Sequence, residues 1–288
     1  MSDSIQANMR ARAGELLELG EVACVIGYER SSRGGVRPVF VYDAATVDRL
    51  VWDNECHHNL MVYLHDRKGR SPRGDEPTRV AVVAKPCDVR ALNVLLHEGQ
   101  VERDQVFIIG VSCEGMGGEG EEVQTRCRRC TERVPVFYDT LVGEAPEVQA
   151  VDEGWADVVE LETMTPEERL GFWTREFDRC IRCYACRQAC PGCYCFECMA
   201  EQVDPLWMGI AIELPEKAFF HVMRAYHLAG RCVECDACEQ ACPMQIPLSL
   251  LNRKLTKEVE ALFGYCAGGD PETPPPLATF RKDEELPL

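Results

Sequence analysis

Two runs of cysteines with the same spacing stand out in the second half of this 288-residue chain. Each run follows the pattern Cys-x-x-Cys-x-x-Cys-x-x-x-Cys-Pro, and the eight thiols are Cys180, Cys183, Cys186, Cys190, Cys232, Cys235, Cys238 and Cys242. This is the ligand spacing of paired 4Fe–4S clusters, in which the fourth cysteine of each run ligates the other cluster. We therefore predict one cluster on the first three cysteines of the first run with Cys242, and a second on Cys232, Cys235 and Cys238 with Cys190. Such a chain transfers electrons.

Three other interpretations of these cysteines fit less well. Structural zinc needs neither a third cysteine in register nor the proline that follows each run. A disulfide framework needs an oxidising compartment, whereas residues 1–20 are polar and show no secretory signal. The cysteines at 186, 190 and 193 also match the spacing of radical S-adenosylmethionine enzymes, but the chain lacks the repeated strand–helix units of their barrel.

The first half has a second set of cysteines at the ends of predicted strands. Residues 79–84 and 105–111 are apolar and flank a helical segment at 89–97, which predicts a β-α-β unit. Consecutive strands of such a unit are parallel, and their carboxyl ends meet at one edge of the sheet. Cys87 and Cys113 follow these two strands, and Cys127 and Cys130 lie on the next loop. We predict a third 4Fe–4S cluster on these four thiols, with zinc as the alternative.

A denser group of thiols follows the first run at Cys193, Cys195 and Cys198. Three thiols at this spacing provide most of a further cluster, with Cys266, Cys24 or Cys56 as candidates for a fourth ligand. Buried structural thiols are the alternative, and the sequence does not decide between them.

The charge and hydropathy of the chain restrict its partners and location. A formal net charge of −17 argues against nucleic acid and anionic membranes, both of which need basic surfaces. The longest apolar run, 106–111, is too short to cross a bilayer and is predicted as a buried strand. The 18 cysteines indicate a reducing cytoplasm and an anaerobic way of life. We expect a cytoplasmic chain with protein partners and no membrane span.

The element pattern predicts two domains of different fold class. Residues 1–145 are expected to form an α/β domain with a partly parallel sheet, opened by a helix at 5–19 and strands at 22–27 and 36–42. The acidic stretch 146–165 is predicted as a linker. Residues 166–266 form an all-α dicluster ferredoxin domain, with helices at 166–179, 215–230 and 247–264. The tail 267–288 is expected to be disordered or to wrap on a partner.

Several motifs resemble known iron–sulfur subunits. The segments Ala84 to Leu92 and Ile108 to Cys113 resemble the beta subunits of deazaflavin-reducing hydrogenases and dehydrogenases, the sulfhydrogenase beta subunit and the iron–sulfur chain of anaerobic sulfite reductase. Residues 166–266 are similar to the α-helical ferredoxin module of heterodisulfide reductase. In these families such chains pass electrons between a flavoprotein and a catalytic subunit. In the deazaflavin-reducing branch a flavin-binding region follows the ferredoxin part, whereas here only a helix and a tail follow Cys242, which argues against a flavin of its own.

These observations lead to one principal hypothesis and one alternative. The principal hypothesis is a non-catalytic electron-transfer subunit of a hetero-oligomeric oxidoreductase. It would relay single electrons between a flavoprotein and a catalytic redox subunit such as a hydrogenase, formate dehydrogenase or heterodisulfide reductase. The alternative is a flavin- or deazaflavin-dependent oxidoreductase with its own substrate site in the first domain.

Overall fold

The first half of the chain folds around a five-stranded sheet. The structure is a computed structural model that describes residues 2–64, 79–117, 123–147 and 154–276. The strands are β1 (Val25–Arg30), β2 (Val36–Val41), β3 (Val80–Ala84), β4 (Val106–Val111) and β5 (Thr140–Val142), in the order β2-β1-β3-β4-β5. β1 and β2 are antiparallel, and the remaining neighbours are parallel. The predicted α/β domain with a partly parallel sheet is confirmed.

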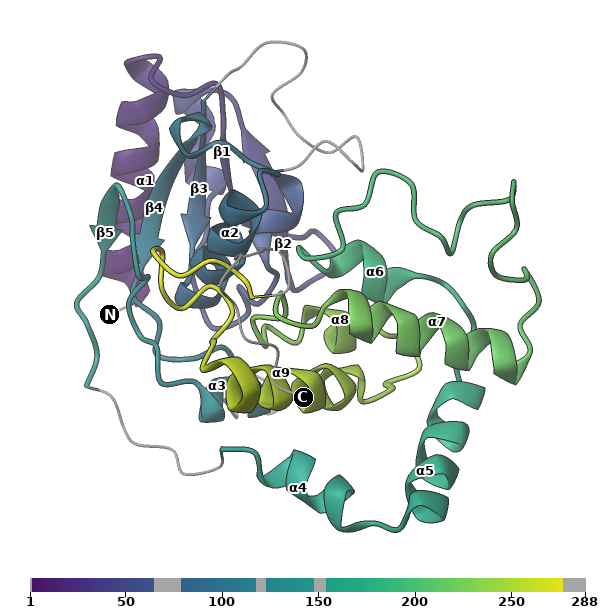
Figure 1. The fold of residues 1–288 in the computed structure, drawn as a ribbon. Helices are drawn as coiled ribbons and strands as arrows, with labels where there is room; N and C mark the ends of the chain where they lie inside the picture. The colour runs from purple at the N-terminus through teal and green to yellow at the C-terminus, as the bar shows by residue number, and fades with distance from the viewer. Residues whose placement is uncertain (1, 65–78, 118–122, 148–153, 277–288) are drawn as a thin grey trace, which may run out of the picture.

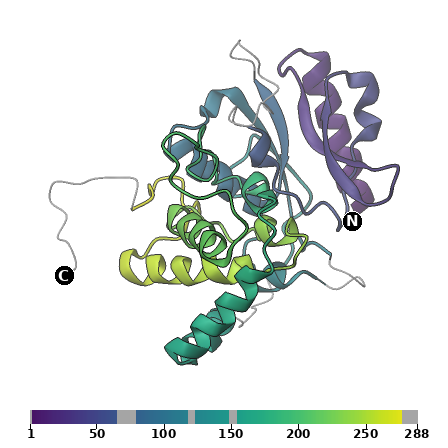
Figure 2. The same cartoon turned by 90° about the vertical axis from the view of Figure 1, so that its right-hand side faces the viewer.

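The β3-α2-β4 unit forms the centre of this sheet. Val80 pairs with Val106 and Ala84 with Gly110, and α2 (Pro86–His97) connects the two strands. Every residue of β3 and β4 is buried, because helix α1 (Ser2–Glu18) covers one face of the sheet and α2 lies on the other (Figures 1 and 2). The predicted pairing is confirmed, and it places Cys87 and Cys113 at the same edge of the sheet.

Helices make up the second half of the chain. They are α4 (Ala156–Thr163), α5 (Pro166–Asp178), α6 (Ala185–Ala189), α7 (Leu214–His227), α8 (Ala237–Gln240) and α9 (Leu248–Phe263). The helix α5 begins at a capping box in which Thr165 and Glu168 bond each other's backbone N–H groups. Figure 1 shows this helical half beside the end of the sheet where the β4 and β3 strands point, with α8 and α9 next to α3 (Thr125–Arg129).

Some elements differ from the expectations. The first strand runs over Val25–Arg30 and therefore starts three residues later than predicted. Its polar end is stabilised by Glu29, which forms ion pairs with Arg37 and Arg49. Short elements without a clear periodicity were not predicted. They are β5, α3, and the 3-10 helices η1 (Ala44–Arg49), η2 (Leu60–Tyr63) and η4 (Arg103–Gln105).

The segments expected to lack structure are partly ordered. Helix α4 lies within the stretch predicted as a linker, of which residues 148–153 lie outside the described residues. The first part of the predicted tail packs against α2, where Arg90 Nε donates to Ala267 O at 3.0 Å and Asn93 Nδ2 donates to Gly268 O at 3.2 Å. Ala267 is 2% exposed. Residues 277–288 of that tail lie outside the described residues.

Candidate iron–sulfur sites

The two cysteine runs adopt the same unusual backbone conformation. Arg182 and Tyr184 in the first run have φ values of 54° and 58°, and Glu234 and Asp236 in the second have 55° and 49°. Left-handed backbone is costly for residues other than glycine, and it clusters at functional sites. In the first run this winding aims the Arg182 N–H at Cys180 Sγ, 3.3 Å away, and in the second the Glu234 N–H bonds Cys232. The repeated spacing is therefore also a repeated three-dimensional loop.

The helices that follow the two loops bring the fourth cysteines across. α6 packs against α8, so the end of each run lies beside the start of the other. Cys242 lies within electrostatic range of Cys180 and Cys186. Cys190 is likewise close to Cys238, which in turn interacts with Cys232 and Cys235. The thiols thus fall into the two groups of four that the spacing predicts.

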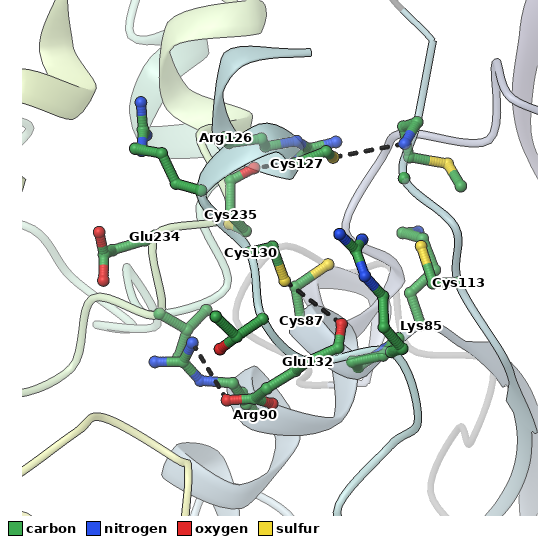
Figure 3. Close-up of a pocket in the computed structure, with 17 residues that line it drawn as sticks. Lys85, Cys87, Arg90, Cys113, Arg126, Cys127, Cys130, Glu132, Glu234 and Cys235 are labelled. Atoms are coloured by element: carbon green, nitrogen blue, oxygen red, sulfur yellow. Dashed lines mark hydrogen bonds and ion pairs between the residues drawn. The ribbon is translucent and has the colours of Figure 1, made fainter. Parts of the chain in front are cut away.

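The thiols of the first domain surround one cavity of about 90 Å³. Cys87 comes from the start of α2, Cys113 from the end of β4, and Cys127 and Cys130 from α3 and its end (Figure 3). Gly115 makes the loop between them possible, because its φ of 111° is a glycine conformation and a Cβ there would stand 3.0 Å from Val123 and 3.4 Å from Cys127. Four thiols from three segments of sequence therefore meet in one place.

The lining of this cavity is basic although the chain as a whole is acidic. Its charged side chains are Lys85, Arg90, Arg126, Arg129, Arg133, Glu132 and Glu234. Burial raises the pKa of the thiols of Cys87 and Cys113, so that bare thiolates are disfavoured there. A thiolate-ligated iron–sulfur cluster carries negative charge, and an excess of cations in its wall stabilises that charge.

Lys85 is the most deeply buried of these cations. Its side chain is 1% exposed, and its Nζ lies 2.8 Å from Asp88 Oδ2 and donates to His58 O at 2.9 Å. Asp88 also accepts a hydrogen bond from Lys85 N at 3.0 Å, which confirms the expectation that Asp88 caps the helix beside Cys87. Burial lowers the pKa of Lys85, but the carboxylate of Asp88 more than offsets this, so its pKa is raised and Lys85 is a fixed positive charge.

The cavity of the first domain is shared with the dicluster region. Cys235 lines it together with Val233 and Glu234 (Figure 3). Arg126 donates to the carbonyl of Cys235 and, through Nη2, to His57 O at 3.0 Å, and Arg129 pairs with Asp236 at 3.2 Å. The helix α3 thus joins the second cysteine loop to the edge of the sheet.

A buried arginine lies between the two thiol groups of the dicluster region. Arg224 on α7 is 7% exposed and donates to Cys186 O at 3.3 Å. The negative forms of Cys193, Cys238, Cys190 and Cys186 all act to raise the pKa of this guanidinium, against burial, which lowers it. The pKa is raised overall, so Arg224 provides a permanent positive charge close to both groups.

The three extra thiols line a separate cavity. Cys193, Cys195 and Cys198 border a space of about 280 Å³ whose other walls include Met208, Phe220, Arg224 and His227. The structure brings none of the three suggested fourth ligands there. Cys24 and Cys56 are in the core of the first domain, and Cys266 Sγ lies 3.2 Å from Arg90 Nη2. Cys193 instead contacts Cys190.

The donor set fits iron–sulfur clusters better than disulfides or single ions. All 18 cysteines are free thiols, and the disulfide alternative is therefore contradicted. Over the described residues, no three histidine, cysteine or acidic side chains converge tightly enough to hold one metal ion. A cubane spreads its four thiolates over four irons and so separates them more widely than a tetrahedral zinc ion does.

Sequence reasoning identified the thiols but missed the cations around them. Lys85, Arg126 and Arg224 are buried, and none was assigned a role. A signal was present for the first two, since Lys85 is two residues from Cys87 and Arg126 precedes Cys127. Arg224 carries no such signal, because it is remote in sequence from every ligand and reaches them only through the packing of α7.

Comparison with known proteins agrees with this geometry. Residues 176–246 match the family model of the 4Fe–4S dicluster domain. The chain is 24% identical over 292 aligned positions to the F420-dependent formate dehydrogenase subunit beta of Methanocaldococcus jannaschii, covering 68% of this chain and 76% of the relative. It is also 24% identical over 300 positions to the F420-dependent formate dehydrogenase 1 subunit beta of Methanococcus maripaludis, covering 70% and 76%.

The fold and the matched segment define an iron–sulfur protein with a 4Fe–4S dicluster domain in its second half. The relatives match the iron–sulfur beta-subunit family of deazaflavin-reducing enzymes, and the resemblance seen in the sequence motifs is confirmed. The matches support an electron-transfer subunit of an oxidoreductase. None of the helices in the described part of the chain has the length and apolar character that a bilayer crossing needs.

Proposed function

We propose that this chain is a three-cluster relay that passes single electrons through a hetero-oligomeric oxidoreductase. One 4Fe–4S cluster would be held by Cys180, Cys183, Cys186 and Cys242. The second would be held by Cys190, Cys232, Cys235 and Cys238, and the third, in the first domain, by Cys87, Cys113, Cys127 and Cys130. The thiols carry the function, and no acid–base residue is needed.

The observation that carries this proposal is the position of Cys235. This cysteine belongs to the second cysteine run and also lines the cavity that the thiols of the first domain surround. Its group interlocks in turn with the other group through the packing of α6 and α8. The order along the relay is therefore the first-domain cluster, then the cluster at Cys235, then the cluster at Cys180.

Iron analysis of the anaerobically purified chain tests the number of clusters. Three clusters require about 12 irons and 12 sulfides per chain. Cys113→Ala should lose about four of them and one electron paramagnetic resonance signal. The matched control is Cys24→Ala, because Cys24 is a buried thiol whose pKa is raised to about 12 by burial and which lines none of the thiol-rich cavities. About eight irons in the unchanged chain, with no loss in Cys113→Ala, would remove the first-domain cluster.

The partners form the second part of the proposal. The relatives are beta subunits of F420-dependent formate dehydrogenases, and this supports a flavoprotein or deazaflavin-using donor at one end and, at the other end, a catalytic redox subunit. Affinity purification of the tagged chain from its own cells, without oxygen, should recover both kinds of protein in fixed ratio. Recovery of the chain alone, with its clusters intact, would contradict this part.

One observation favours a second candidate, an oxidoreductase with its own flavin or deazaflavin site. An open cavity of about 640 Å³ lies at the carboxyl edge of the sheet, and it shares Cys113, Gly115 and Met116 with the thiol-lined cavity. α/β proteins bind ligands at such edges. The absorption spectrum decides between the two: flavin bands together with turnover of a soluble hydride donor support the second candidate, and iron–sulfur absorption alone supports the relay.

A further inference from the structure

The loop between α6 and α7 exposes an unusual number of large apolar side chains. We define the apolar loop as residues 196–212, which Figure 1 shows as the green segment between these helices. Its exposed members are Phe196 (88%), Val203 (74%), Leu206 (55%), Trp207 (63%), Ile210 (85%) and Ile212 (63%). Isolated exposed apolar residues are ordinary, but six within one loop form a contiguous segment of the kind that marks interaction sites. Phe and Trp are also enriched among the residues that dominate binding energy.

The loop is attached to the loop of the first cysteine run. Arg182 lies between Cys180 and Cys183, and its Nη1 donates to Gly209 O at 2.6 Å and Ala211 O at 2.5 Å. Met208 is 5% exposed and packs in the same small core as Cys180 and Cys186. The loop is therefore held at both its backbone and a buried side chain, while the neighbours of Met208 at 207 and 210 face solvent.

The cluster group nearest to this loop is also the one most open to the surface. Cys183 is an exposed thiol, and the adjacent Ile181 is 53% exposed. In contrast, Cys232, Cys235 and Cys238 of the second group are buried or half-buried. A protein seated on the apolar loop would therefore lie over the outer end of the relay.

The charge around the loop indicates the chemistry of its partner. No lysine or arginine occurs from residue 188 to residue 216, whereas this stretch contains Glu197, Glu201, Asp204, Glu213 and Glu216. Glu201 is paired with Arg187, and Glu216 accepts from Gly209 N at 3.1 Å. Glu197, Asp204 and Glu213 are exposed. A second copy of this chain would present the same carboxylates and be repelled.

We propose that the apolar loop is the docking site for an electron-transfer protein whose contact face has an apolar centre and a rim of lysine and arginine. This inference rests on the proposed relay function and names the surface at which electrons leave or enter the chain. Apolar contact provides the affinity, and charge complementarity provides orientation and rapid encounter.

A basic cytochrome c is a suitable probe, because it accepts one electron and carries lysines around its haem edge. The chain is first reduced anaerobically with reduced methyl viologen, a small donor that needs no docking site. In the measured step one reduced cluster loses one electron and one ferric haem becomes ferrous, with no bond or proton transferred. Stopped-flow absorbance gives the second-order rate constant.

The test variant is Trp207→Ser with Ile210→Ser, which changes only exposed side chains. The matched control is Leu19→Ser with Tyr42→Ser, at positions 64% and 62% exposed on the first domain. We expect the test pair to lower the rate constant about tenfold, and the control pair to leave it within about twofold. Glu197→Gln with Asp204→Asn should weaken its dependence on salt more than Glu21→Gln with Glu102→Gln does, although the net charge change is the same.

Several outcomes would overturn the inference. They are an unchanged rate in the test pair, an equal fall in both pairs, or a dimer of the unchanged chain in light scattering that the test pair converts to a monomer. If reduced methyl viologen does not reduce the chain, the relay function itself fails, which is a different result. In the native complex, amide exchange over residues 196–212 should slow when the redox partner binds, and unchanged exchange would also contradict the proposal.

Discussion

Arg126 donates a hydrogen bond to the backbone carbonyl of Cys235, joining two residues 109 positions apart in the chain. The arginine is 7% exposed and lies beside thiols of both groups, since Cys87, Cys127 and Cys235 all act to raise the pKa of its guanidinium. The contact therefore does two things: it fixes the distance between the two candidate clusters, and it places a positive charge between them.

Removing this charge should lower the reduction potential of the clusters it faces. A reduced cluster carries one more negative charge than the oxidised form, so a nearby cation stabilises the reduced state. For Arg126→Met we expect a fall of about 60 mV, which corresponds to ~1.4 kcal/mol for one electron. Redox titration followed by electron paramagnetic resonance measures it. The control is Arg128→Met on the exposed side of the same helix, and an equal shift there would exclude a local effect.

The pair Lys85–Asp88 should be much more important to stability than an ordinary surface pair. Both side chains are almost completely buried, so loss of one partner leaves an uncompensated charge in the core. Lys85→Met should destabilise the folded chain by roughly 3–5 kcal/mol. The double variant Lys85→Met with Asp88→Asn should lose less than the single variant, because no buried charge remains. Anaerobic urea unfolding tests this, and a double variant as unstable as the single one would contradict it.

The sequence predicted the parts of the fold whose physical signal is local. The buried runs that became β3 and β4 lack any polar residue, and this required a sheet covered on both faces. The end of α9 was marked by Gly264, which takes a φ of 62° at the helix terminus. The strand β5 was not predicted, because three residues carry too little periodicity and its pairing with β4 is a tertiary effect.

The candidate sites divide in the same way. Cysteine spacing within each run indicates a ligand set directly, and strand ends indicated where Cys87 and Cys113 would meet. No local pattern specifies that Cys235 borders the first-domain cavity, because that depends on how α3 and the second cysteine loop pack. The tail was misjudged for a related reason. Its composition is typical of disorder, but Ala267 and Gly268 fit against α2.

His221 should make the stability of the second domain sensitive to acid. Its ring stacks on Phe177 at 5.0 Å, and neither ring nitrogen has a hydrogen-bond partner among the described residues. Burial, and secondarily the charge of Arg224, lowers its pKa from 6.5 to about 4. Between these values the unfolded chain binds a proton that the folded chain does not, so the free energy of unfolding falls as the pH drops from 6.5 towards 4.

Replacing His221 with phenylalanine removes this titration and keeps the aromatic stack. The loss of stability between pH 7 and pH 5 should be smaller in His221→Phe than in the unchanged chain, by on the order of 1–2 kcal/mol. Urea unfolding followed by tryptophan fluorescence at the two pH values provides the comparison. His227→Phe is the control on the same helix, since His227 is exposed. Parallel pH curves for the unchanged chain and His221→Phe would show that His221 does not titrate in this range.

Gly268 should be the residue that allows the C-terminal segment to pack on α2. Its φ is 67°, and a Cβ added there would stand 2.1 Å from the carbonyl oxygen of Arg90, a backbone atom that cannot move aside. Gly268→Ala should therefore release residues 267–276 from α2 and expose them to protease and to amide exchange. Gly264→Ala is the matched control, because Gly264 has a φ of 62° with nothing within 4 Å, so this variant suffers only backbone strain of about 1 kcal/mol. Faster exchange at 267–276 in Gly268→Ala alone supports a steric role for the contact, and equal effects in both variants would assign it to backbone conformation.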